Sequence, residues 1–568
     1  MTPPPTEHGA PYRPADFETL ADALDYAATA CTGIAFHDTK GQLNAVLGYT
    51  DLQREAQACA RRLLGAGLTR GDAVALIAET VPRFVVTFFA CQYAGLIAVP
   101  LPVTVHLGGR EAFVRTLARL VGHSRARMCL GTADYAGFID EANLPGLLIA
   151  GDYAKLDVVT PSSAEPQPTR ADEVAYVQFT SGSTRLPRGA VITAQGVLRN
   201  VEAMLRFCVT PEDRFCSWLP LYHDMGLVGK LLAPVCGQAS VDYLDSRVFA
   251  MRPRLWPALI SRNGGTISYS PPFGYELCAR RLRGDDAAGY RLNQWRIAGV
   301  GGEMIRADVL RRFADAFADS GFDARAFTPS YGMAEVGLGL SFAPQFTPLA
   351  TDHVDRDRCA DEGLAIPVSA DAEHAREFVL CGRVLPGYTV EIRDDAGELR
   401  NEREVGEIYL RGPSIMRGYL DEDDATAAVL KNGWLDTGDL GYWLGDQLVL
   451  TGRRKDLIIV NGRNIWPQDL EFIAENEGVR TGSAAAFSVQ REGGEEVVMV
   501  VECRNAEVDD EIALLKRIRT HVRAEFGVDC LLVAAEPRTL PRTTSGKLSR
   551  VRARQLYESG GIPDPGRR

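Results

Sequence analysis

Most of the chain up to about residue 450 alternates short apolar runs with amphipathic stretches. Residues 73–78 read Ala-Val-Ala-Leu-Ile-Ala, which is typical of a buried strand, and residues 53–64 have the spacing of a helix that closes near Gly65. Strands that alternate with helices in this way fold into α/β layers. We therefore predict a large multi-layer α/β domain in this part of the chain.

The pattern changes from about residue 457 onward to that of a compact α+β unit. Residues 457–460 form a predicted strand, after which Asn461-Gly462 is expected to turn the chain. Pro467 is expected to open a helix, since its missing N–H costs nothing in the first turn. Residues 511–526 form a further predicted helix with one apolar face. The sequence thus predicts a small α+β domain at the C-terminal end.

Chain length supports this division, because 568 residues are too many for one core. We predict an N-terminal domain at residues 1–454 and a mobile C-terminal domain at residues 455–568. A polar segment at about residues 347–377 lacks clear periodicity and is expected to be a long surface loop or insertion. The last seven residues, 562–568, are expected to be disordered.

Composition excludes some classes of protein. The net charge of −12 argues against broad nucleic-acid binding. Twelve cysteines occur without a Cys-x-x-Cys pair, which is typical of a reduced, cytoplasmic protein without a structural zinc site. The uncharged run at residues 84–103 has the length of a membrane span. Gly95, Pro100 and Pro102 interrupt it, so we predict a buried helix and a core strand there, and no transmembrane segment.

A loop rich in glycine and hydroxyl residues joins two predicted strands at residues 174–179 and 190–193. Backbone N–H groups in a glycine-permitted turn can approach a triphosphate closely. The loop lacks the Gly-Lys-Ser/Thr of a Walker-type loop and does not run into a helix, which argues against a P-loop NTPase. A flexible linker is the alternative interpretation. The candidate phosphate ligands are Thr180, Ser181, Gly182, Ser183, Thr184 and Arg188, of which Thr184 could also reach magnesium.

Three later motifs accompany this loop. The stretch Tyr331-Gly332-Met333-Ala334-Glu335 ends in a carboxylate that is either a metal ligand or a structural hydrogen-bonding partner. Asp439 follows a Thr-Gly pair and is suited to accept both ribose hydroxyls, although these residues also suit a plain turn. Arg453 and Lys455 lie in a charged run that a solvated surface would equally explain. Lys547 lies far along the chain, so chemistry at a bound phosphate requires two parts of the protein to meet.

In this order, the loop and the motifs resemble those of the adenylate-forming superfamily, which contains acyl-CoA synthetases, luciferases and peptide-synthetase adenylation domains. Within it the chain looks most like the fatty acyl-AMP ligases, on the evidence of residues 218–227, 270–278 and 462–471. The segment at 347–377 is similar to the insertion of these ligases. The resemblance implies that this insertion packs near the mobile domain and hinders the use of CoA, with a plain surface elaboration as the alternative.

The resemblance also implies a role for each matching residue. Lys547 would bind the acyl carboxylate and the α-phosphate, His223 would border the carboxylate, and Lys455 would be the hinge. Magnesium would lie near Thr184 and Glu335. Adenosine would contact Gly301, Gly302, Glu303, Ser330, Tyr331, Gly332, Met333, Asp439 and Arg453. The acyl pocket would include His223, Met225, Gly226, Phe273 and Tyr275. The chain departs from the family at Arg185 (usually Gly), Arg188 (usually Lys) and Pro272 (usually Asn).

The implied function is the ATP- and Mg²⁺-dependent conversion of a medium- or long-chain fatty acid to acyl-AMP. Transfer of the acyl group to the phosphopantetheine thiol of an acyl carrier protein would follow. Arg550, Arg552 and Arg554 could meet an acidic helix of the carrier, or form a solvated stripe. Two other functions stay open: an acyl- or aryl-CoA synthetase that uses free CoA, and a catalytically silent nucleotide-binding or scaffold protein.

Overall fold

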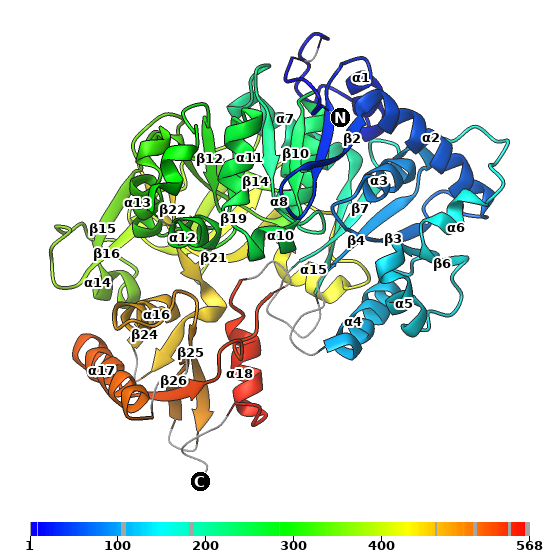
Figure 1. Ribbon diagram of the computed structural model, residues 1–568. Helices are drawn as coiled ribbons and strands as arrows, with labels where there is room; N and C mark the ends of the chain where they lie inside the picture. Colours follow the sequence, from blue (N-terminus) through cyan, green and yellow to red (C-terminus); the bar gives the residue numbers. More distant parts are fainter. Residues whose placement is uncertain are drawn as a thin grey trace.

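The computed structural model describes residues 2–7, 9–103, 109–180, 187–282, 284–460, 463–491, 494–503, 508–543 and 547–562. Its elements form a large body and, below it in Figure 1, a smaller part made of the last strands and helices. Within the described ranges no helix has the length and apolarity needed to cross a membrane.

The largest sheet has nine strands, with parallel pairs in its centre and antiparallel pairs at both edges. Its order is β17-β14-β13-β12-β11-β9-β10-β1-β2. The strands are β1 (Gly33–His37), β2 (Leu43–Gly48), β9 (Phe215–Ser217), β10 (Val241–Leu244), β11 (Ile267–Ser270), β12 (Ile297–Val300), β13 (Phe327–Gly332), β14 (Gly339–Phe342) and β17 (Arg383–Val384). Because β12 and β13 are parallel, Val300 pairs with Pro329 and the residues that follow both strands meet at one edge.

A second sheet has six strands in the order β6-β5-β3-β4-β7-β8, and it ends in an antiparallel hairpin of β7 and β8. The strands are β3 (Ala73–Ile77), β4 (Ile97–Leu101), β5 (Met128–Gly131), β6 (Ile149–Asp152), β7 (Val174–Phe179) and β8 (Gly189–Thr193). The predicted strands at 73–78, 174–179 and 190–193 are confirmed, and the glycine-rich loop does join two strands. The run at 84–103 is a buried helix and a core strand, as predicted.

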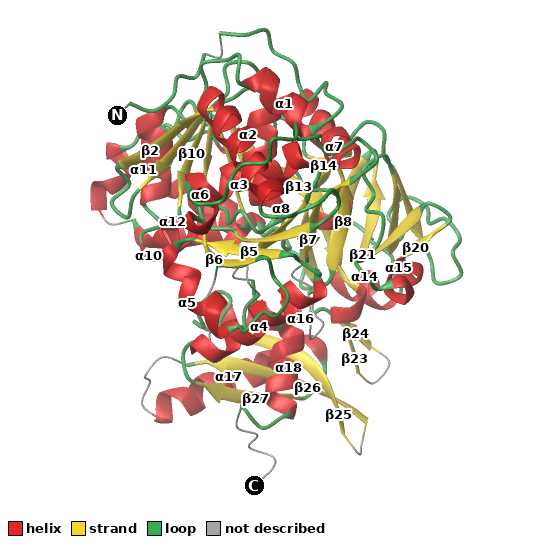
Figure 2. Cartoon of the chain, turned by 90° about the vertical axis from the view of Figure 1, so that its right-hand side faces the viewer, coloured by secondary structure: helices red, strands yellow, loops and turns green. Residues whose placement is uncertain are grey.

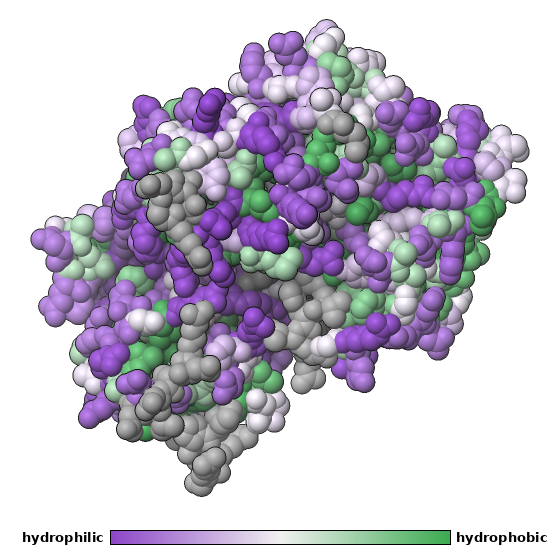
Figure 3. Space-filling model, in the orientation of Figure 1, coloured by the Kyte–Doolittle hydropathy of each residue, from purple (hydrophilic) through white to green (hydrophobic). Residues whose placement is uncertain are grey.

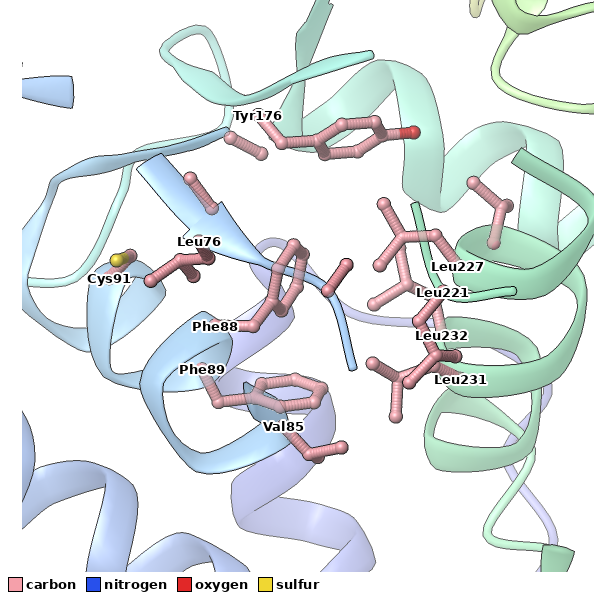
Figure 4. Close-up of a cluster of buried hydrophobic side chains, with 14 of the residues drawn as sticks. Leu76, Val85, Phe88, Phe89, Cys91, Tyr176, Leu221, Leu227, Leu231 and Leu232 are labelled. Atoms are coloured by element: carbon pink, nitrogen blue, oxygen red, sulfur yellow. The ribbon is translucent and has the colours of Figure 1, made fainter. Parts of the chain in front are cut away.

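Helices cover both sheets and bury two apolar clusters, a main core shared by both sheets and a second one that includes residues of α10–α13. They are α1 (Leu20–Ala27), α2 (Tyr49–Gly65), α3 (Pro82–Ala94), α4 (Gly109–His123), α5 (Ala133–Glu141), α6 (Ala154–Asp157), α7 (Ala194–Cys208), α8 (Asp224–Gly226), the π-helical η1 (Leu227–Leu232), α9 (Ala233–Cys236), α10 (Ser246–Met251), α11 (Leu255–Asn263), α12 (Pro272–Arg281) and α13 (Ala307–Ala316). Figure 4 shows how they meet: Phe88 and Phe89 of α3 point toward Leu227, Leu231 and Leu232 of η1.

A third sheet connects the large body to the C-terminal part. It contains β18 (Thr389–Arg393), β19 (Gly406–Arg411), β20 (Leu430–Lys431), β21 (Trp434–Leu444) and β22 (Gln447–Arg453), with α15 (Asp423–Val429) before β20. The hairpin of β21 and β22 places Asp439 directly opposite Arg453. Two of the predicted nucleotide residues are therefore brought together by strand pairing alone.

The prediction of a long surface loop at residues 347–377 is wrong. The segment holds β15 (Thr351–Asp355), α14 (Arg356–Asp361) and the start of β16 (Ala375–Val379), and the two strands pair antiparallel. Val354, Cys359 and Phe378 are buried against Tyr442 and Val449 of the third sheet. This apolar partner is distant in sequence, which is why the local pattern gave no sign of the elements.

The C-terminal part is an α+β unit around the three-stranded sheet β25-β26-β27. Its elements are β23 (Ile458–Val460), β24 (Arg463–Ile465), α16 (Pro467–Asn476), β25 (Ala484–Arg491), β26 (Gly494–Glu502), α17 (Val508–Phe526), β27 (Cys530–Ala535) and α18 (Arg550–Glu558), and the 3₁₀ turn η6 (Arg454–Asp456) precedes them. The predicted helix that opens at Pro467 and the overall fold class are confirmed. The predicted turn at Asn461-Gly462 lies outside the described residues. Ile562, expected to be disordered, is fully buried, and residues 563–568 lie outside the described ranges.

Charged side chains join the two parts of the molecule. Arg356 Nη1 of α14 lies 3.0 Å from Glu525 Oε2 of α17, and Arg376 Nη1 of β16 lies 2.9 Å from Asp469 Oδ2 of α16. Figure 2 shows the C-terminal sheet and helices set apart below the large sheets, and hydrophilic residues prevail on the face drawn in Figure 3. Polar contacts of this kind, rather than a shared apolar core, are typical of domains that move relative to each other.

Candidate active site

A cavity of about 350 Å³ opens where the C-terminal part meets the large body. Part of the cavity wall is polar. The rest is apolar and surrounds an arm of the cavity that is lined by residues of the large body. Many of the residues singled out in the sequence meet on this wall, although they come from distant parts of the chain. They are Thr180, Arg188, His223, Met225, Gly301, Gly302, Ser330, Tyr331, Gly332, Met333, Glu335, Arg453, Lys455 and Lys547.

Asp439 lies behind the polar wall and is almost completely buried. It accepts a hydrogen bond from the Tyr331 hydroxyl at 2.6 Å, and its other oxygen lies 3.2 Å from Arg453 Nε. Strand β13 supplies the tyrosine and the β21–β22 hairpin supplies the other two residues. The carboxylate is thus held in a fixed orientation at the edge where β12 and β13 end.

Glu335 follows β13 in the 3₁₀ turn η5 (Ala334–Val336), and its carboxylate forms part of the cavity wall. The Tyr419 hydroxyl donates to Glu335 Oε1 at 2.9 Å. Burial raises the pKa of Glu335, although this hydrogen bond acts in the opposite direction. Arg188 lies beside the pair, 5.2 Å from the centre of the Tyr419 ring. A carboxylate and a cation therefore face the same space from two sides.

The donor chemistry of this wall fits magnesium that arrives with a phosphate. Magnesium is usually bound by one or two carboxylates together with substrate phosphates and water. Glu335 supplies one such carboxylate, and the described residues contain no cluster of three or more His, Cys, Asp or Glu that could hold a metal by itself. Ser181, Gly182, Ser183 and Thr184 lie outside the described residues, so the loop and the second predicted metal ligand have no structural description.

Lys547 enters this cavity from the C-terminal part. Two hydrogen bonds fix its backbone to Thr543: the Thr543 N–H donates to the Lys547 carbonyl at 2.7 Å, and the Lys547 N–H donates to Thr543 Oγ1 at 3.2 Å. A Cβ built on Gly302 would lie 3.3 Å from Lys547 Nζ. Burial lowers the pKa of the Lys547 ammonium, while Glu303 and Asp224 act in the opposite direction. The lysine thus lies among the polar residues of the large body.

His223 reaches the cavity from a tight turn before α8. The Gln178 side chain donates to the Tyr222 carbonyl at 2.7 Å, and His223 Nδ1 lies 2.5 Å from Asp224 Oδ1. Gly226 is essential to this turn, because a Cβ there would lie 2.1 Å from the Pro220 carbonyl oxygen. Burial opposes ionisation of Asp224, but His223 and Lys547 outweigh it and lower its pKa.

Several predicted site residues lie away from the cavity wall. Tyr275 is fully buried among aromatic rings, and its hydroxyl donates to the Gly299 carbonyl at 2.9 Å. Tyr275 does not line this cavity, so its assignment to the acyl pocket stays a prediction without support from the cavity wall. The Phe273 N–H donates to Glu303 Oε1 at 3.3 Å, which places both residues behind the wall. Gly226 shapes the turn of His223 instead of lining the pocket.

Sequence reasoning missed the apolar arm. Its side chains come from α7, β9, η1, α9, β11 and β14, and include Met204, Leu205, Phe215, Ala233, Ile267, Leu338 and Phe342. No local pattern distinguishes them from core residues. One signal was available, a single lysine within the apolar run at residues 226–236. Lys230 does line the arm.

The structure also changes the interpretation of Arg550 and Arg554, which belong to the predicted arginine stripe. Arg550 holds Glu471 through two hydrogen bonds of 2.7 and 2.6 Å and lies 3.6 Å from Asp456 Oδ2. It stabilises the inside of the C-terminal part and is not free to meet a carrier protein. Arg554 pairs with Glu558 one turn along α18.

A family model of AMP-binding enzymes matches residues 25–420. The chain belongs to this family, and its predicted resemblance to the adenylate-forming superfamily is confirmed. Among solved structures, a fatty acyl-adenylate ligase from a study of the E. coli and L. pneumophila enzymes superposes with a TM-score of 0.93. The two chains are 42% identical, and the match covers 97% of this chain and 100% of the other.

Curated relatives agree with that similarity. A long-chain-fatty-acid–AMP ligase of Mycolicibacterium smegmatis is 32% identical, over 87% of this chain and 86% of the relative. A Caulobacter vibrioides protein with the provisional name of acyl-CoA synthetase is 44% identical over 99% of both chains.

Proposed function

We propose that this protein activates a fatty acid with ATP, forming acyl-AMP and releasing pyrophosphate. The approach of Lys547 to Gly302 carries the proposal, because it brings an ammonium group from the C-terminal part to the junction of the polar wall and the apolar arm. The polar wall suits a nucleotide and the arm suits an acyl chain. The similarity to fatty acyl-adenylate ligases supports the same reaction.

The reaction needs alignment and charge neutralisation more than covalent help. A carboxylate oxygen attacks the α-phosphorus of ATP; a new P–O bond forms, and the bond to the bridging oxygen of pyrophosphate breaks. Preorganised cations lower the barrier by stabilising the charge on the phosphoryl oxygens. Lys547 would contact the carboxylate and the α-phosphate, Arg188 would contact the departing pyrophosphate, and His223 would border the carboxylate.

The nucleotide would be held by the ends of β12 and β13 and by the β21–β22 hairpin. Asp439 would accept the ribose hydroxyls, since Tyr331 and Arg453 fix its orientation. Adenine would lie against Gly301, Gly302, Ser330, Gly332 and Met333, which line the cavity, while Thr180, Ser181, Gly182 and Ser183 would bind the triphosphate. Thr184 and Glu335 would hold magnesium, which would neutralise phosphate charge when bound.

The second half of the proposal is acyl transfer to the phosphopantetheine thiol of an acyl carrier protein. The C-terminal domain, residues 455–568, would turn about Lys455 against residues 1–454. The interface is polar, and the β15–α14–β16 segment is tied to the C-terminal part through Arg356–Glu525 and Arg376–Asp469. That contact supports a role of the segment in excluding CoA. A reduced, cytoplasmic setting belongs to the proposal and agrees with twelve free cysteines.

A second candidate is an acyl-CoA synthetase, favoured by the provisional name of the 44% identical relative. A pyrophosphate-release assay with fatty acids from short to long, repeated with CoA or with a phosphopantetheinylated carrier protein, separates the two. We expect acid-dependent release of pyrophosphate and thioester formation on the carrier alone. Thioester formation with CoA would favour the second candidate, and no release with any acid would reject both.

A further inference from the structure

Lys230 is a buried charge that the proposed reaction does not use. Its residue is only 2% exposed, and it lines the apolar arm of the cavity. Within the described part of the chain no carboxylate forms an ion pair with its ammonium. The ammonium lies over two aromatic faces, 4.2 Å from the Tyr269 ring centre and 5.0 Å from the Phe215 ring centre.

A buried ammonium without an anion is unfavourable, because it loses hydration that ring faces replace only in part. Burial lowers the pKa of Lys230 to about 7, while the thiols of Cys208 and Cys216 act in the opposite direction. A second polar group in the same wall is also unsatisfied, since the Tyr269 hydroxyl has no hydrogen-bond partner among the described residues. The arm thus keeps a buried ammonium that an entirely hydrocarbon occupant would leave unpaired.

Packing does not require a cation at this position. In Figure 4, Leu227, Leu231 and Leu232 point from η1 into the main core toward α3, and these residues anchor the helix. Lys230 lies between them in sequence but lines the cavity instead. The turn that carries it is π-helical, a distortion that is rare and occurs frequently at functional sites.

The helix also sets the distance between two polar residues of the cavity wall, His223 and Lys230. His223 caps the first turn of α8, and Lys230 follows seven residues later in η1. With the α-helical rise of about 1.5 Å per residue as an upper limit, the two backbone positions are at most roughly 10 Å apart along the helix, the length of a medium acyl chain. The wall between them is apolar, with Leu205 and Ile267 among its residues.

We propose that Lys230 is a specificity residue that selects an acid with an oxygen acceptor at the far end of its chain. A carboxylate there would pair with the ammonium, and a hydroxyl or keto oxygen would accept its hydrogen bond. A plain alkyl end would leave the buried group unpaired, and sites built around such a group discriminate strongly against a ligand that lacks its partner. The inference rests on the proposed acid-activating function and narrows its substrate class.

The test compares acids that differ only at the far end. Acid-dependent pyrophosphate release by the full chain is measured with decanoic acid and its ω-hydroxy, ω-oxo and ω-carboxy analogues, and with the sets one ethylene unit shorter and longer. We expect kcat/KM for at least one oxygenated acid to exceed that of the plain acid by about tenfold or more. Preference for the ω-carboxy acid identifies an ion pair, and preference for the others identifies a neutral acceptor.

Two variants assign the effect to the side chain. Lys230→Met has a similar volume without the charge, and should remove the preference while raising the melting temperature. Lys40→Met, at an exposed turn, is the matched control and should change neither.

The inference is rejected, and acid activation stands, if the wild type shows equal kcat/KM for plain and oxygenated acids at every length. It is also rejected if Lys230→Met keeps the preference. If no acid supports pyrophosphate release, the proposed function itself is rejected.

Discussion

Lys547 and Gly302 lie in contact although they are far apart in the chain. A Cβ on Gly302 would lie 3.3 Å from Lys547 Nζ, and the Gly302 backbone has a positive φ of 83°. Glycine is thus favoured twice at this position, by its conformation and by the space that the lysine occupies. This distance shows how closely the C-terminal part approaches the polar wall of the cavity.

Gly302→Ala should therefore impair acid-dependent pyrophosphate release. The positive φ costs about 1–2 kcal/mol for alanine, and the added methyl group crowds Met225 Sδ at 3.1 Å and the Lys547 ammonium at 3.3 Å. We expect kcat to fall by about tenfold or more, because small displacements at a reacting centre have large effects on rate.

Gly445→Ala is the matched control. Gly445 also has a positive φ, 59°, but a Cβ there would meet no atom within 4 Å. The melting temperature should fall by a similar amount in both variants, and only Gly302→Ala should lose activity. Equal activity of the two variants would show that Lys547 does not work from the position beside Gly302.

Removal of the ammonium should be more damaging than its displacement. Lys547→Ala should lower the rate of adenylate formation by about 10² to 10³, the usual effect of losing a donor that stabilises charge in the transition state. Binding of a preformed acyl adenylate should change little, which calorimetry can measure. Normal pyrophosphate release by this variant would contradict the assignment of Lys547.

The pH profile should report the same group. The active form of Lys547 is the ammonium, and burial lowers its pKa, so the rate should fall as pH rises through a value below the ordinary lysine pKa of about 10.4. Lys547→Arg keeps its charge to higher pH and should lose this alkaline limb even if its rate is lower. An unchanged limb in the arginine variant would assign the titration to another group.

Elements with strong local patterns could be predicted from the sequence. Residues 174–179 coincide with β7, and Pro467 does begin α16. In contrast, β15 and β16 pair with each other across a helix and are buried against the third sheet and, through Val379, against the large body, so their stability is not visible locally. Pairing between distant segments depends on contacts that a window of sequence does not contain.

The residues of the candidate site also fall into two groups, those that the sequence predicts and those that depend on the fold. Motif residues such as Glu335 and Asp439 could be found because their order along the chain is distinctive. The orientation of Tyr275 could not, because the side of α12 that faces the cavity depends on how that helix packs on its neighbours. Lys230 could be noticed as a lone charge in an apolar run, but its position in the wall of the apolar arm follows only from the fold.

The β15–α14–β16 segment leads to a last prediction, about the acyl acceptor. Arg356 lies over the Phe526 ring at 4.1 Å and pairs with Glu525, so it ties α14 to the end of α17. Arg356→Ala should loosen this contact and leave pyrophosphate release within about twofold, since Arg356 does not line the cavity. If the segment excludes CoA, thioester formation with free CoA should rise severalfold.

Arg358→Ala is the matched control for this change, because Arg358 belongs to the same helix but pairs with Glu362 within the segment. It should leave the acceptor preference unchanged. CoA use that stays equally low in both variants would show that the tie between α14 and α17 does not control the acceptor. A gain in CoA use that is confined to Arg356→Ala would instead show that this contact controls which thiol reaches the adenylate.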